Sequence, residues 1–81
     1  MKIHVKLFAA ARDIVDAENV ELDVDPPATI KAIRQELCDQ HPALLPLVGV
    51  SMFAVDTQYV ADDVEVPAGA EVACIPPVSG G

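Results

Sequence analysis

Aromatic and basic residues are scarce in this sequence. Its 81 residues include two phenylalanines, one tyrosine and no tryptophan, and five basic residues stand against 13 acidic ones, for a formal net charge of −8. This charge disfavours nucleic acids and anionic membranes as partners, because their phosphates repel it. Basic protein surfaces would attract it. Excess carboxylates also promote solubility, so charge alone leaves both interpretations open.

Cysteines and long apolar runs are scarce as well. Cys38 and Cys74 cannot build a disulfide framework, and their spacing matches no zinc motif, so no metal site is expected. No apolar run approaches the roughly 20 residues that cross a bilayer. The polar segment 2–8 is too short for the apolar region of a signal peptide. We therefore expect a cytoplasmic protein.

The sequence also lacks the residue sets that usually catalyse reactions. It contains no glycine-rich phosphate loop and no evident Ser/His/Asp set. A chain of this length buries little more than about 60% of its unfolded surface, which leaves no room for an internal cofactor cavity. Its hydrophobic content of 52% nevertheless argues against disorder. We expect one small domain that is not catalytic alone and works with a larger partner.

Apolar and polar residues alternate in two segments, 3–8 and 20–24. A period of two is typical of strands with one buried face. In the first segment, the alternation that buries Val5 turns Phe8 outward. Both segments are therefore predicted to be strands that contribute one face to the core.

One longer helix is predicted between two clear signals. Thr29 is a suitable N-cap, and Pro42 disfavours helical geometry at the residue before it, so the helix should end near Gln40. The remaining expected elements are a short helix at 9–15, an apolar connection at 44–49, and strands at 50–55, 59–61 and 71–75.

The most informative segment is the last, Pro76-Pro77-Val78-Ser79-Gly80-Gly81. Its prolines fix φ and favour a stiff extended chain, whereas its glycines carry no Cβ and can pass through a narrow channel. Fully extended, the six residues reach about 20 Å. We predict that 76–81 is a tail that leaves a domain formed by 1–75 and carries its carboxylate into another protein.

Three segments resemble one known family: 7–13, 33–37 and, most specifically, 69–81. On these segments the chain is similar to the small subunits of molybdopterin synthase (the MoaD family), which are ubiquitin-like sulfur carriers. The resemblance covers essentially the whole chain. It implies an α+β domain of the β-grasp (ubiquitin-like) type, in which a mixed sheet of four to five strands packs on one main helix and ends in a flexible Gly-Gly tail.

The resemblance also implies a function for the tail. An adenylating (ubiquitin-activating-like) enzyme would use ATP to activate the carboxylate of Gly81, and a sulfur donor protein would convert it to a thiocarboxylate. With Gly80, Gly81 would then enter the large subunit and donate sulfur to cyclic pyranopterin monophosphate, which forms the molybdopterin dithiolene. The chain itself would bind no cofactor, and the family implies a heterotetramer.

Strand alternation and the tail together predict a partner-binding surface. Its expected members are Phe8, Tyr59, Ile75, Pro76, Pro77, Val78 and Ser79. Cys74 is expected to face the helix as a small buried hydrophobe rather than to handle sulfur. Three alternatives stay open: a sulfur carrier for thiamine or tRNA thiolation, a ubiquitin-like protein modifier, and an interaction module whose tail is incidental.

Overall fold

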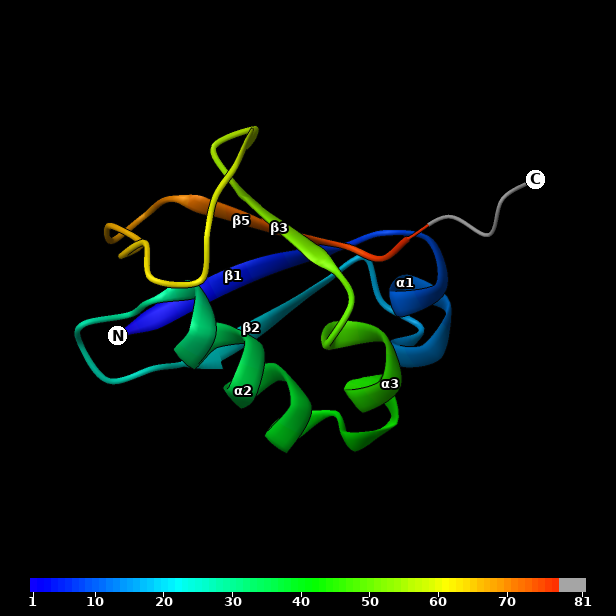
Figure 1. Cartoon of the computed structure of the whole chain (residues 1–81). Helices are drawn as coiled ribbons and strands as arrows, with labels where there is room; N and C mark the ends of the chain where they lie inside the picture. The colour runs from blue at the N-terminus through cyan, green and yellow to red at the C-terminus, as the bar shows by residue number, and fades with distance from the viewer. Residues whose placement is uncertain (78–81) are drawn as a thin grey trace.

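A computed structural model describes residues 1–77, in which one five-stranded sheet packs on a main helix (Figure 1). The elements along the chain are β1 (Lys2–Leu7), α1 (Ala9–Val15), β2 (Asn19–Asp23), α2 (Ile30–Gln40), the 3-10 turn η1 (Pro42–Leu44), α3 (Leu45–Val48), β3 (Met52–Val55), β4 (Gln58–Tyr59) and β5 (Glu71–Ile75). None of the helices in these residues is long and apolar enough to cross a bilayer.

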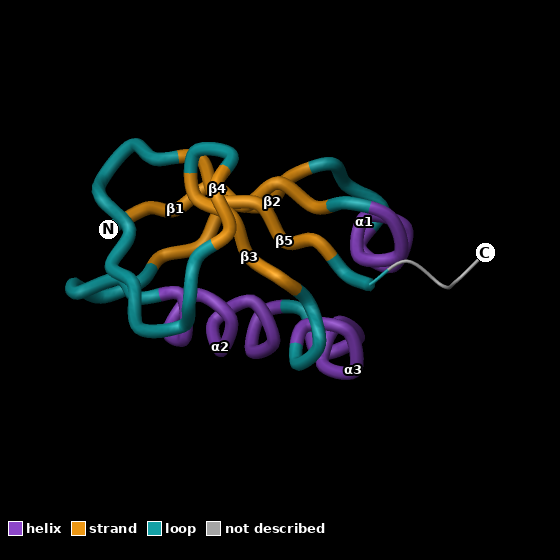
Figure 2. Tube along the Cα trace, turned by 45° about the horizontal axis from the view of Figure 1, so that its top comes forward, coloured by secondary structure: helices purple, strands orange, loops and turns teal. Residues whose placement is uncertain are grey.

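The sheet is mixed, with strand order β2-β1-β5-β3-β4. The central strand β5 runs parallel to β1 and antiparallel to β3, and the two outer pairs are antiparallel hairpins. Helices α2 and α3 lie on one side of this sheet (Figure 2). This arrangement is the predicted α+β β-grasp architecture, and it places the last strand at the centre of the sheet.

The core forms between α2 and the near face of the sheet. Alternate residues of β1 are buried, as its period of two predicts, and Val5 is fully covered. From the helix, Ile30, Ile33 and Leu37 supply one apolar face at helical spacing. We call this side of the sheet the inner face and the opposite side the outer face.

The main helix begins and ends as predicted. The Thr29 hydroxyl accepts a hydrogen bond from the Ala32 amide at 3.2 Å, which satisfies one of the free donors of the first turn. The helix ends at Gln40, because the residue before Pro42 leaves helical geometry.

Four of the five strands differ from the prediction by one or two residues at their ends. The first two, β1 and β2, each begin and end one residue earlier than predicted. The third strand begins at Met52 instead of Val50, because the Val50 amide donates to the Leu47 carbonyl at 3.1 Å and closes a turn. The fourth strand is Gln58–Tyr59 instead of 59–61. It begins early because Asp56 and Thr57 both adopt positive φ, +48° and +71°, which makes a tight two-residue hairpin turn.

Candidate functional site

The last strand leads directly into the predicted tail. In β5, Cys74 is buried on the inner face and Ile75 is half-buried on the outer face. The Pro76 side chain is also buried, whereas Pro77 is exposed. Because Pro76 is buried, little of its side chain is available for the predicted partner contact. Within residues 1–77, Pro77 is the first exposed residue of the predicted tail.

The other tail residues lie outside the described part of the chain. These are Val78, Ser79, Gly80 and Gly81. Their roles in partner binding and sulfur transfer therefore stay predictions.

Strand pairing places Tyr59 of β4 in the same row of the outer face as Lys6 of β1. Lys6 pairs with Ala73, Ala73 with Ala54, and Ala54 with Tyr59, so these four residues form one row across the sheet. Directly paired residues present their side chains on the same face. Tyr59 is 62% exposed and ends this row.

Phe8 lies at the other end of the outer face. It follows β1 in extended conformation as the N-cap residue of α1, and its side chain is half-buried. The Lys6 ammonium lies 5.3 Å from the centroid of the Phe8 ring, within the range of a cation–π contact. The extended backbone keeps Phe8 on the same face as Lys6, as predicted.

Sequence reasoning missed one apolar member of this face. Met52 pairs directly with Ile75 and is 56% exposed. Its signal was present in the sequence, because burial of Phe53 turns both neighbours in the strand outward. We define the outer patch as Phe8, Met52, Tyr59 and Ile75, a set of apolar side chains beside the root of the tail.

Charged groups also lie on the outer face, along β1. Lys2 donates a hydrogen bond to Glu21 at 2.9 Å, and the imidazole of His4 lies 3.4 Å from the other oxygen of the same carboxylate. The hydrogen bond and charge of Glu21 raise the pKa of Lys2, and the same hydrogen bond and the charge of Lys2 lower the pKa of Glu21. The outer face therefore carries charged side chains along β1 and apolar side chains near the end of β5.

The two thiols differ in access to solvent. Cys74 is fully buried, as predicted, and burial raises the pKa of its thiol, opposed in part by the Ser51 side chain. Cys38 is half-buried on α2, and burial is also the main cause of its raised pKa. A protonated thiol is a poor nucleophile. Within residues 1–77 no three His, Cys, Asp or Glu side chains gather in a way that could hold a metal ion.

A β-grasp domain whose central strand leads into a C-terminal Gly-Gly segment defines the class of ubiquitin-like proteins. Within this class the chain belongs to the ThiS family, whose sequence profile matches residues 5–81. Among curated proteins, it is 37% identical to the molybdopterin synthase sulfur carrier subunit of Escherichia coli, covering 98% of this chain and 99% of that protein. It is 32% identical to the subunit of the same name from Caenorhabditis elegans, over 100% and 99% of the two chains.

Solved structures show the same fold. SAMP1 from Haloferax volcanii superposes with a TM-score of 0.85 at 30% identity, and each chain is covered completely. A subunit in a complex of subunits 1 and 2 of the molybdopterin-converting factor from Helicobacter pylori has a TM-score of 0.70, also with complete coverage. Because the sequences of this second pair are only 21% identical, the similarity shows a shared fold and nothing more.

Proposed function

We propose that this chain is the sulfur carrier subunit of a molybdopterin synthase. The observation that carries the proposal is the similarity to subunits of that name over 98–100% of this chain. The ThiS family profile, which matches residues 5–81, includes the Gly80-Gly81 segment. The geometry supports it, because the central strand β5 passes beside the apolar outer patch and continues into the segment that would react. A partner bound to the patch would therefore receive the tail.

The reacting group in this proposal is the carboxylate of Gly81. A carboxylate is a poor electrophile, because its charge repels nucleophiles and oxide is a poor leaving group. Reaction with ATP in an adenylating partner gives an acyl-adenylate and releases pyrophosphate. A persulfide of a donor protein then displaces AMP and forms an acyl disulfide. A second thiol cleaves its S–S bond by exchange, which leaves the thiocarboxylate.

The large subunit would supply the pocket in which sulfur is transferred. The outer patch would bind it, and the tail would bring the thiocarboxylate to cyclic pyranopterin monophosphate. The sequence contains no nucleotide-binding loop, so ATP chemistry is assigned to the activating partner. This chain therefore contributes the carrier group and the docking surface rather than the catalytic residues.

Intact mass spectrometry tests this function. With ATP, an adenylating partner and a sulfur donor, the mass of the chain should rise by the difference between sulfur and oxygen, at Gly81. Deletion of Gly81, or addition of one residue after it, should abolish sulfur transfer and leave the unfolding curve unchanged. A mass change at Cys38 or Cys74, or normal product formation by the deletion variant, would contradict the proposal.

A second candidate function is that of a protein modifier joined to lysines through Gly81. One observation favours it. SAMP1 of Haloferax volcanii, at 30% identity, has the fold of this chain, and a second Haloferax volcanii structure, at 28% identity, is described as small archaeal modifier protein 1. Peptide mass spectrometry of cell extracts distinguishes the two functions. Gly81 in isopeptide bonds to other proteins would support the modifier, and a thiocarboxylate would support the carrier.

A further inference from the structure

Exposed apolar side chains concentrate in the segment that runs from α3 to β4. Of the six large apolar residues that are exposed in the described part of the chain, four lie between 45 and 59. Two of them, Leu45 at 64% and Val50 at 62%, lie outside the outer patch, and Met52 belongs to it. We call residues 45–52 the shoulder.

The shoulder is held in place by a single polar side chain from α2. One terminal nitrogen of Arg34 donates to the carbonyls of Val48 and Ser51, and the other donates to the Asp62 carboxylate at 2.8 Å. Its guanidinium also stacks over the Phe53 ring, 4.7 Å from the centroid. These contacts tie the end of α3 and the turn before β3 to the main helix.

Within the shoulder, Ser51 adds a local contact. Its hydroxyl donates to the Leu47 carbonyl at 2.7 Å, and its side chain is buried. The turn that carries Val50 is thus fixed from both sides. A rigid segment loses little conformational entropy when it binds a partner, so its exposed apolar side chains are preorganised for docking.

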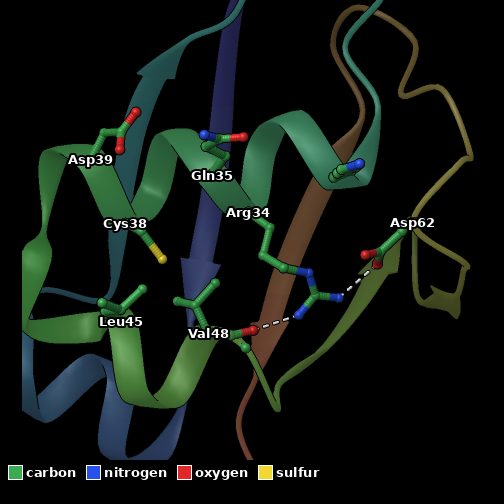
Figure 3. Close-up of a pocket in the computed structure, with 9 residues that line it drawn as sticks. Arg34, Gln35, Cys38, Asp39, Leu45, Val48 and Asp62 are labelled. Atoms are coloured by element: carbon green, nitrogen blue, oxygen red, sulfur yellow. Dashed lines mark hydrogen bonds and ion pairs between the residues drawn. The ribbon is translucent and has the colours of Figure 1, made fainter.

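A groove lies between the shoulder and α2 (Figure 3). Leu45 and Val48 project from α3 toward Cys38 and Arg34 of α2, and the groove has a volume of about 420 Å³. The mouth is flanked by Asp39 and other polar residues. It is large enough to accept one apolar side chain from another protein.

The shoulder is continuous with the outer patch. Met52 is the direct strand partner of Ile75, and Val50 precedes it by two residues. Exposed apolar side chains therefore follow one another along the chain from Leu45 at the groove, through Val50, to Met52 on the outer face. A protein that binds the outer patch can extend its contacts along this segment to the groove.

We propose that the shoulder is a second part of the surface that binds the large subunit, which places an aliphatic or aromatic side chain against Leu45 in the groove. This inference rests on the proposed function for the identity of the partner. Binding would then cover two sides of β3, at the outer patch and at the shoulder. Such an arrangement would fix the direction in which the tail leaves the domain as well as the position of the domain.

Calorimetric titration with the large subunit encoded in the same genome tests the proposal. Leu45→Ser and Val50→Ser should each weaken binding by about five- to tenfold, because each removes an apolar contact from the interface. Val64→Ser, which changes an exposed apolar residue outside the shoulder, is the matched control and should bind as the wild type does. Urea unfolding of each variant separates loss of binding from loss of folding.

Cys38 provides a second readout in the wild-type chain. Its thiol faces the groove (Figure 3). Cys74, in contrast, is fully buried. Saturation with the large subunit should slow alkylation of Cys38 by iodoacetamide at least about fivefold, because a side chain in the groove would cover the thiol. Peptide mass spectrometry assigns the modified cysteine. At a large-subunit concentration that just saturates the wild type, Leu45→Ser should lose most of this protection.

The outcomes separate the two proposals. If the wild-type chain does not bind the large subunit, the proposed function fails and the shoulder proposal fails with it. If the wild type binds, but both shoulder variants retain its affinity and Cys38 stays unprotected, the shoulder proposal alone is wrong. Sedimentation of the isolated chain gives a further check, since a dimer that Leu45→Ser dissociates would assign the shoulder to a second copy.

Discussion

The two faces of the sheet differ in how their apolar side chains are covered. On the inner face, Val5, Val72 and Cys74 are fully buried against the helix layer. On the outer face, Met52 and Tyr59 remain more than half exposed. Folding alone therefore removes the apolar side chains of the inner face from solvent. The outer face retains apolar surface that only a partner can cover. A substitution on either face should show which of the two processes it serves.

The largest effect is expected on the inner face. Val5→Ala removes two buried methyl groups from the centre of the core and should lower the free energy of unfolding by about 2 kcal/mol. Urea unfolding followed by circular dichroism measures this loss. Affinity for the large subunit should stay close to that of the wild type once the fraction of folded protein is taken into account. Stability equal to that of the wild type would mean that the inner face contributes less than its burial indicates.

A smaller effect of a different kind is expected on the outer face. Phe8→Ala should weaken binding to the large subunit by about tenfold, or roughly 1.4 kcal/mol, because aromatic residues in interface patches contribute much of the binding energy. Its unfolding curve should change much less than that of Val5→Ala. Calorimetric titration gives the affinity. Wild-type affinity together with a severely destabilised fold would show that the roles of the two faces are reversed.

The smallest effect concerns pH and the buried thiol of the inner face. Burial raises the pKa of Cys74 above its ordinary value of 9.0, so the unfolded chain loses this proton first as pH rises. The free energy of unfolding should therefore fall from about pH 9 upward, until the pKa of the folded state is passed.

Comparison with Cys74→Ala isolates this contribution. The variant should show a shallower decline of the free energy of unfolding between about pH 8 and pH 10.5 under reducing conditions, because it has no thiol to ionise at this position. Parallel curves for the two proteins would contradict the assignment of the pH dependence to Cys74.

The elements set by local signals could be predicted from the sequence. Alternation located β1 and its buried residues, and the pair of Thr29 and Pro42 located both ends of α2. These signals act within a few residues, so they do not depend on the rest of the fold. The strand order and the β-grasp topology came instead from resemblance to a family, because periodicity does not specify which strands pair.

The features set by distant contacts were not predictable in the same way. Arg34 was one residue of a helix in the sequence, yet its bonds to the carbonyls of Val48 and Ser51 shape the shoulder and contribute to the late start of β3. Pro76 was predicted as part of the tail, yet its side chain packs into the domain. Both depend on elements that lie far away in the chain, and neither leaves a local pattern.

The burial of Pro76 limits how far the proposed reaction can occur from the domain surface. In the proposed reaction, residues 77–81 connect it to the reacting carboxylate, and five fully extended residues span no more than about 18 Å. Every protein that acts on Gly81 must therefore place its reactive centre within that depth below the surface on which this domain rests. The adenylating enzyme and the large subunit would therefore both have to place their reactive centres within this depth, whatever their folds and chemistry.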